Sequence, residues 1–257
     1  ERVEALTDAC YRRRRLKQVL LLVCVAMVVL ALARPWWGRH LVPATNRARD
    51  VLVALDCSRS MLAQDVAPSR LDHAKWLIRT LIERSPGDRF GLIAFAGDAF
   101  LECPLTRDRN TLFTFLDDLD TRTIPVGGTN IAEALQEARD AFKAAEGGDH
   151  AVVLVSDGDE LQGDAISQAK ALQDQGVPLL VVGLGDAVNG SMIRLPDGSY
   201  LRDAKGEFVS SKLNEAKMRE LARIAEGIYL RSTAISPNID PLVDRIQALI
   251  PDQGDEQ

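Results

Sequence analysis

Residues 51–60 read Val51-Leu52-Val53-Ala54-Leu55-Asp56-Cys57-Ser58-Arg59-Ser60. Five successive apolar residues predict a buried strand, and a carboxylate and two hydroxyls follow it at alternate positions. Because alternate residues of an extended chain point the same way, Asp56, Ser58 and Ser60 would bring three oxygen atoms together at the carboxyl end of the strand. Such oxygen ligands suit a hard cation such as Mg²⁺. Alternatively, either serine could cap the next helix.

Two later segments lead to the same edge of the predicted sheet. Gly127-Gly128-Thr129-Asn130 precedes a run with helical spacing, and Asn130 with Glu133 resembles a capping box, so Thr129 would lie just before a helix. A second apolar strand, residues 151–155, ends in Ser156-Asp157. The chain therefore offers, in order, Asp-x-Ser-x-Ser, a threonine in a glycine-rich loop, and a strand-terminal aspartate.

This series resembles the metal-ion-dependent adhesion site of von Willebrand factor A-type domains. The resemblance implies that Ser58, Ser60 and Thr129 are hydroxyl ligands of Mg²⁺ or Mn²⁺, and that Asp56 and Asp157 hold the ion, commonly through water. It also implies an incomplete coordination shell that an acidic side chain of a partner protein completes. An exchangeable position is chemically reasonable, since Mg²⁺ usually retains several waters.

The remaining pattern predicts an α/β fold, a doubly wound and mostly parallel sheet of the von Willebrand A or Rossmann-like type. Apolar runs indicate strands at residues 51–55, 90–95, 100–101, 151–155 and 177–184. Helical spacing covers residues 71–82, 112–119, 131–142, 166–172 and 218–225. Turn signals within residues 192–213 predict a small β-hairpin insertion, which is either a decorative loop or a partner-binding elaboration.

The amino-terminal segment predicts one transmembrane helix at residues 19–37, after a basic cytoplasmic segment at residues 1–18. Residues 19–33 carry no charge, and a helix through Trp37 would span about 28 Å, close to the roughly 30 Å hydrocarbon core. Arg12–Arg15 and Lys17 favour an exported domain by the positive-inside rule. A cleavable signal peptide ending at Ala31-Leu32-Ala33 is the alternative, and it also exports the domain.

Residues 46–235 are expected to form the von Willebrand A-type domain, and residues 236–257 a C-terminal helix and tail leading toward a missing segment. Residues 1–40 carry eight Lys/Arg and three Asp/Glu, a net charge of +5. Because the whole chain has a net charge of −6, residues 41–257 carry −11. This acidic excess argues against nucleic-acid binding. Cys57 and Cys103 could pair in an oxidising periplasm, or remain two buried thiols.

Further stretches are similar to the Bat aerotolerance membrane proteins, and nearest to their BatB-like branch. They are residues 58–71, Phe95-Ala96-Gly97, Cys103-Pro104-Leu105-Thr106 and Leu195-Pro196-Asp197-Gly198. The resemblance implies a bacterial inner-membrane protein with a periplasmic domain, and sister Bat proteins and a MoxR-type AAA ATPase as partners. That branch commonly continues into another membrane helix and tetratricopeptide repeats, which this chain does not contain.

The predicted function is a metal-dependent protein–protein interaction module in stress tolerance or envelope protein assembly, without catalytic activity. The alternative is a Mg²⁺-dependent, phosphatase-like hydrolase that uses Asp56 as its nucleophile. In haloacid-dehalogenase phosphatases a second aspartate stands two residues after the nucleophile and serves as the acid. Ser58 occupies that position here and cannot supply a carboxylic proton.

Overall fold

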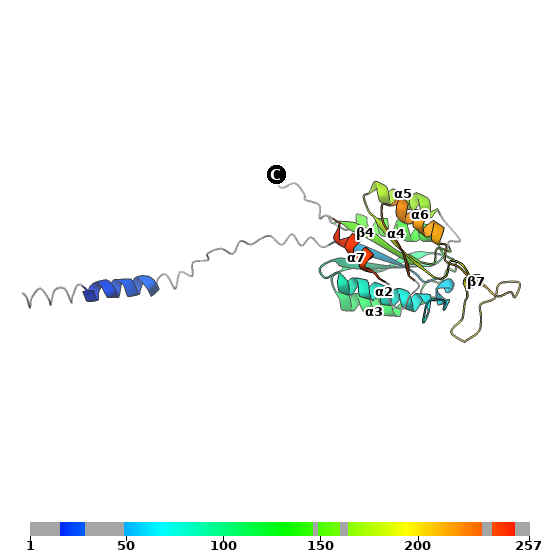
Figure 1. Ribbon diagram of the computed structural model, residues 1–257, viewed down its shortest axis with the longest axis horizontal. Coiled ribbons are helices and arrows are strands. Elements are labelled where there is room, and N and C mark those ends of the chain that lie inside the picture. The colour runs from blue at the N-terminus through cyan, green and yellow to red at the C-terminus, as the bar shows by residue number, and fades with distance from the viewer. Residues whose placement is uncertain (1–15, 29–48, 146–148, 160–163, 233–237, 250–257) are drawn as a thin grey trace, which may run out of the picture. The chain divides into compact units, whose positions relative to one another are not determined.

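The structure is a computed structural model that describes residues 16–28, 49–145, 149–159, 164–232 and 238–249. Its central sheet has the strand order β3-β2-β1-β4-β5-β8 (Figure 1). The strands are β1 Asp50–Asp56, β2 Arg89–Phe95, β3 Ala99–Thr106, β4 His150–Ser156, β5 Leu179–Leu184 and β8 Tyr229–Ser232. Only β3 runs antiparallel to its neighbour. The predicted mostly parallel α/β fold is confirmed.

Helices cover both faces of the sheet, three on each (Figure 1). One face carries α2 Arg70–Arg84, α3 Arg109–Asp118 and α7 Asp240–Gln247, and the other carries α4 Ile131–Lys143, α5 Ala165–Asp174 and α6 Glu215–Ile224. The position of β1 between two cores explains why its central residues, 51–55, are all apolar. Val51, Val53 and Leu55 pack into one core, while Leu52 and Ala54 pack into the other, so neither face tolerates a polar side chain.

The helix boundaries follow local sequence signals. Asn130 caps α4, with its side-chain oxygen accepting a hydrogen bond from the Glu133 backbone N–H at 3.2 Å, as the capping pattern predicted. Ser69 caps α2 in the same way through the backbone N–H of Asp72. The sequence patterns did not predict strand β8, which has only four residues and follows the turn at Gly227.

The predicted insertion is present but contains little regular sheet. Strands β6 Ser191–Met192 and β7 Ser210–Ser211 pair antiparallel, and single bridges join Arg194 to Tyr200 and Arg202 to Phe208. Two tight turns therefore replace the single hairpin that the sequence suggested. Figure 1 shows these loops extending from the end of the domain that is marked β7.

The amino-terminal unit is described only in part. Residues 16–28 form a helix with exposed side chains, while residues 29–37 of the predicted transmembrane helix lie outside the described residues. Among the helices that the structure describes, none has the length and apolar character needed to cross a bilayer. The division of the chain into compact units falls between Thr45 and Asn46.

Candidate metal centre

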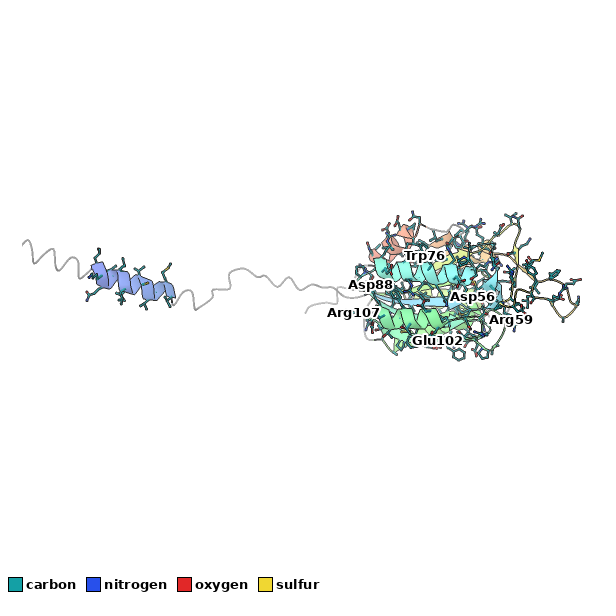
Figure 2. The ribbon with its side chains drawn as sticks, turned by 90° about the horizontal axis from the view of Figure 1, so that it is seen from below. Asp56, Arg59, Trp76, Asp88, Glu102 and Arg107 are labelled. Carbon is teal, nitrogen blue, oxygen red and sulfur yellow. The ribbon has the colours of Figure 1, made fainter. Side chains whose placement is uncertain are left out.

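The predicted metal ligands lie at one edge of the sheet, where three segments of the chain end. Asp56 is the last residue of β1, and Asp157 directly follows β4. These strands are parallel neighbours, and they mark the point where the strand order reverses, which is where open α/β sheets usually bind ligands. Figure 2 shows Asp56 and Arg59 at the same end of the domain as the insertion, away from Asp88.

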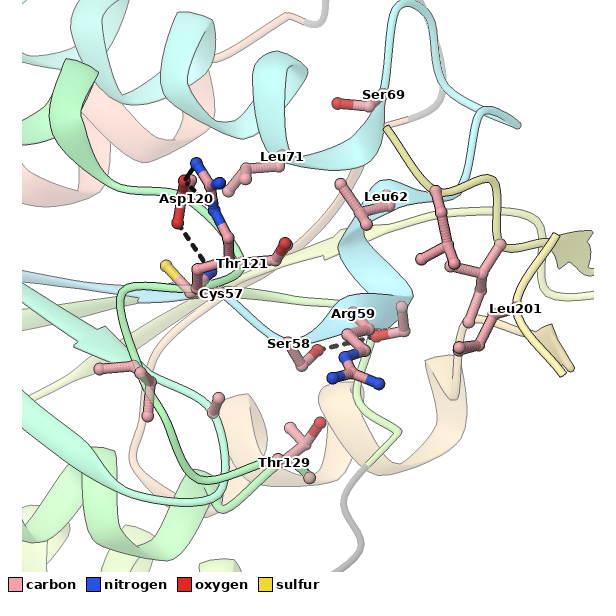
Figure 3. Close-up of a pocket in the computed structure, with 18 of the residues that line it drawn as sticks. Cys57, Ser58, Arg59, Leu62, Ser69, Leu71, Asp120, Thr121, Thr129 and Leu201 are labelled. Carbon is pink, nitrogen blue, oxygen red and sulfur yellow. Dashed lines mark hydrogen bonds and ion pairs between the residues drawn. The ribbon is translucent and has the colours of Figure 1, made fainter. Parts of the chain in front are cut away.

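The two serines continue from β1 into the short 3₁₀ helix η1, Arg59–Leu62. Ser58 is the N-cap residue of η1, yet its side chain makes no capping hydrogen bond. Instead its hydroxyl lies 2.8 Å from the Ser60 hydroxyl, and its backbone N–H donates to Asp56 Oδ1 at 2.8 Å. The alternative of a purely capping serine is therefore disfavoured for Ser58. Ser58 and Ser60 line the same cavity, which Figure 3 shows with Ser58 and Thr129 labelled.

Thr129 reaches this edge because its loop is pinned to the turn after β2. The backbone N–H of Asn130 donates to the Ala96 carbonyl at 2.6 Å, and that of Gly97 donates to the Val126 carbonyl at 3.1 Å. A Cβ atom at Gly97 would lie 2.5 Å from the carbonyl oxygen of Gly127, so the close approach requires glycine. Thr129 is buried, and its hydroxyl donates to no other described residue.

Asp56 is a buried carboxylate without a cationic partner among the described residues. Its side chain is fully inaccessible, and its oxygens accept hydrogen bonds from the Ser58 N–H and, at 2.6 Å, from the Ser156 hydroxyl. Burial, with the nearby charge of Asp157 as the second cause, raises the pKa of Asp56 to about 7. Because buried charges are normally paired or bound to metal, the environment of Asp56 fits a divalent ion.

Asp157, by contrast, is neutralised by the chain itself. The fully buried guanidinium of Arg70 donates from Nη1 to Asp157 Oδ2 at 2.8 Å, and the Ser211 hydroxyl donates to the same oxygen at 2.9 Å. Arg70 fits because residue 185 is glycine, where a Cβ would lie 2.8 Å from the guanidinium carbon. Among the described residues, the second carboxylate oxygen of Asp157 accepts a hydrogen bond only from the backbone N–H of Asp159, at 3.2 Å.

Asp65 completes this arrangement by holding the other side of Arg70. Its two oxygens accept from Nε at 2.8 Å and from Nη2 at 2.7 Å, a bidentate pair. Despite partial burial, the bonds from Arg70 keep the pKa of Asp65 below its ordinary value. The sequence patterns did not identify Asp65, Ser156 or Ser211 as residues of the site. Only Ser156 had a local signal, since it directly precedes Asp157 at the strand end.

A cavity of about 970 Å³ opens above these residues. Ser58, Ser60 and Thr129 line it, whereas Asp56 and Asp157 lie beneath and do not. Asp159 also lines the cavity, and burial together with the charge of Asp157 raises its pKa. No set of three or more His, Cys, Asp or Glu side chains among the described residues is arranged to hold a metal, so any ion here depends on the hydroxyls.

Cys57, at this edge, and Cys103, in the middle of β3, are free, buried thiols. Cys57 and Cys103 make no disulfide, which favours the second of the two sequence-based alternatives. Burial raises the pKa of the Cys57 thiol, with the charge of Asp56 as the second cause. A neutral thiol of this kind is a small apolar side chain.

Comparison with known proteins assigns the family. The family model described as "von Willebrand factor type A domain" matches residues 51–160. The structure of BatB from Bacteroides thetaiotaomicron is 35% identical in sequence, with a TM-score of 0.74, over 79% of this chain and 98% of that chain. The chain belongs to the Bat family of von Willebrand A-domain proteins. Domains of this type are generally interaction modules and often bind a metal at the corresponding site.

Two further relatives agree. An aerotolerance-related membrane protein from Bacteroides fragilis is 36% identical, with a TM-score of 0.72, again over 79% of this chain and 98% of that chain. A UPF0353 protein from Mycolicibacterium gilvum is 33% identical over 186 residues, which are 68% of this chain and 55% of that protein. The chain thus spans about half the length of the curated relatives it matches. The Bacteroides fragilis relative is described by its name as a membrane protein.

Proposed function

We propose that this chain is a membrane-anchored module that binds a partner protein through a divalent metal ion. One observation carries the proposal: Asp56 is a fully buried carboxylate whose hydrogen-bond donors, Ser58 and Ser156, are neutral. A buried carboxylate without a cation is costly unless it is protonated or metal-bound. A divalent cation beside the neighbouring hydroxyls would remove that cost.

The ligand set suits Mg²⁺ or Mn²⁺, and each side chain has a separate role. Ser58, Ser60 and Thr129 present hydroxyl oxygens to the cavity, while Asp56 and Asp157 lie behind them as carboxylates. Oxygen-only coordination is the preference of these hard cations. When bound, the ion supplies a positive charge with an exchangeable position, which an Asp or Glu side chain of the partner can occupy.

The phosphatase-like alternative gains no support. A nucleophilic Asp56 would need an accessible oxygen, yet its side chain has no exposed surface and both oxygens already accept hydrogen bonds. The hydroxyl of Ser58 is also too weak an acid to protonate a leaving group as a carboxylic acid would. Binding rather than turnover is the better account of this site.

Anchoring and partners rest on the amino-terminal segment and on the family. Residues 19–33 form an uncharged apolar run, which supports an anchor in the membrane. The basic residues before this run support the proposal of a bacterial inner-membrane protein whose domain lies in the periplasm. Sister Bat proteins and a MoxR-type AAA ATPase would be its partners, in stress tolerance or envelope protein assembly.

Calorimetric titration with Mn²⁺ tests the metal site. Thr129→Val removes one hydroxyl at nearly constant volume, and Thr121→Val is the matched control because Thr121 lines the same cavity but is not a predicted ligand. We expect Thr129→Val to weaken Mn²⁺ binding by about ten-fold or more and Thr121→Val to leave it unchanged. Equal Mn²⁺ affinity of all three proteins would show that the site is wrongly assigned.

Partner capture tests the proposed use of the ion. Immobilised wild-type chain should retain a partner from membrane extracts in Mg²⁺ and release it in EDTA, and Thr129→Val should retain less. Capture that is indifferent to both EDTA and Thr129→Val would reduce the ion to a structural role.

A further inference from the structure

The insertion and the candidate metal centre form two walls of one cavity. Besides the hydroxyls, the cavity of about 970 Å³ is lined by five apolar side chains of the insertion, namely Ile193, Leu195, Pro196, Leu201 and Val209. Leu62 of η1 lines the same cavity as Leu201, and both are labelled in the close-up (Figure 3). A carboxylate bound at the metal would therefore lie beside apolar side chains of the insertion, which are not needed to complete the hydrophobic cores of the domain.

Contacts at both ends of the insertion fix its position beside the cavity. Ser211 of β7 is buried, and its hydroxyl lies within hydrogen-bond distance of both Arg70 Nη1, at 2.8 Å, and Asp157 Oδ2, at 2.9 Å. At the other end of the insertion, Ile193 forms a bridge with Ala63, just after η1. Both attachments lead directly to elements that carry predicted ligands.

The apolar residues of this wall are only half covered. Leu195, Leu201 and Val209 are each of intermediate burial, and they face a cavity rather than the core. A volume of about 970 Å³ lies at the upper end of the roughly 300–1,000 Å³ that small-molecule sites occupy. That space accommodates several residues of an extended peptide rather than a single carboxylate.

Charge complementarity selects an acidic occupant. Arg59 lines the cavity, is exposed, and forms no ion pair with any described residue. The other cations of the lining are engaged, since Arg122 pairs with Asp120 and Lys75 donates to the carbonyl of Asp117. Three aspartates, Asp72, Asp120 and Asp159, line the cavity as well, so its side chains carry no net charge. The attraction for an Asp or Glu therefore comes from the ion, and Arg59 is an exposed cation beside it.

We infer that the insertion is a specificity wall for an acidic-apolar peptide segment of a partner protein. An Asp or Glu of that segment binds at the metal, and a bulky aliphatic or aromatic side chain within about three residues of it packs on Leu195, Leu201 and Val209. This inference rests on the proposed function and deepens it, because the ion alone would accept any accessible carboxylate. The apolar wall decides which acidic segment is bound.

Selection from a random heptapeptide library with a fixed central Asp tests the inference. The full 257-residue chain is immobilised in detergent with Mg²⁺, and bound peptides are eluted with EDTA. We expect bulky apolar residues to be enriched near the Asp. Leu201→Ser should weaken the best selected peptide by about ten-fold or more while leaving Mn²⁺ affinity unchanged. Met192→Ser is the matched control, since Met192 is an exposed apolar residue of the insertion outside the cavity lining.

The outcomes separate this inference from the proposed function. Metal-dependent peptides without an apolar preference, or with unchanged affinity for Leu201→Ser, would overturn the specificity wall and leave the metal site intact. Failure to recover any EDTA-eluted peptide would overturn both. Mg²⁺-dependent dimers in light scattering that the selected peptide cannot dissociate would assign the cavity to a second copy of this chain, which also overturns the inference.

Discussion

Replacing Asp56 by asparagine should make the metal-free protein more stable at alkaline pH. The carboxylate is fully buried, and burial together with the charge of Asp157 raises its pKa from the ordinary 3.8 to about 7. Asparagine has nearly the same shape, carries no charge, and can still accept the hydrogen bond from the Ser58 N–H. The substitution therefore removes the cost of burying a charge without opening a cavity.

The magnitude and the sign follow from linkage. An acid whose folded pKa exceeds its unfolded pKa costs nothing below pH 3.8, costs progressively more between pH 3.8 and about 7, and costs its full amount above that range. At about 1.4 kcal/mol per pKa unit, the full cost is about 4 kcal/mol. At pH 5 less than half of it has developed. The metal-free wild type should thus lose stability as the pH rises from 5 to 8.

Urea unfolding in EDTA at pH 5 and pH 8 measures this difference. Asp56→Asn should unfold at higher urea than wild type, with an advantage of about 4 kcal/mol at pH 8 and less than half as much at pH 5. Mg²⁺ should stabilise the wild type and have little effect on the variant. Asp118→Asn, an exposed aspartate at the end of α3, is the control and should match wild type. An Asp56→Asn protein that is less stable than wild type at pH 8, or an advantage that does not shrink at pH 5, would refute the reasoning.

Two further predictions concern the buried cation and the topology. Arg70→Met leaves Asp157 and Asp65 without their cation and should cost about 3–5 kcal/mol in urea unfolding. Arg79→Met breaks a solvent-exposed pair with Asp117 and a contact with the Phe113 ring, and it should cost about 1 kcal/mol. Similar losses would show that Arg70 is not the internal counter-ion. Alkaline phosphatase fused after Gln257 should be active, because it folds only when exported; an inactive but stable fusion would place the domain in the cytoplasm.

Much of the fold was predictable because local patterns and tertiary needs agree. Strands β1 and β4 are buried on both faces, so their sequences are apolar without interruption. Asn130 marks the start of α4 because its side chain caps the helix through the backbone N–H of Glu133, three residues later. Strand β8 lacks such a signal, since Arg231 and Ser232 make up half of it and its pairing with β5 depends on tertiary contact. Its approach also depends on Gly227, where a Cβ would lie 1.9 Å from the Leu179 carbonyl oxygen.

Some residues of the candidate site were likewise predictable from local sequence, whereas others were not. Asp56, Ser58 and Ser60 lie within five residues at a strand end, so local sequence reveals them. The contact between Arg70 and Asp157 joins residues 87 positions apart, and the one between Arg70 and Ser211 spans 141. Their proximity follows from the parallel register of β1 and β4 and from the return of the insertion. No short motif contains that information.

Arg70 pairs with Asp157 but not with Asp56, and this difference between the two carboxylates of the site bears on ligand choice. Its contact with Asp157 cancels one of two buried negative charges, so Asp56 alone would stand against a divalent ion. At the rim, Asp159 and Arg59 contribute opposite charges to the cavity. Arg70 is also paired with Asp65, so Asp65 belongs to the same set. Together with a divalent ion, these two arginines and four aspartates have a net formal charge of zero. Without Arg70 the same set would carry −1 and would repel an incoming carboxylate. The buried arginine therefore favours an acidic partner without touching it.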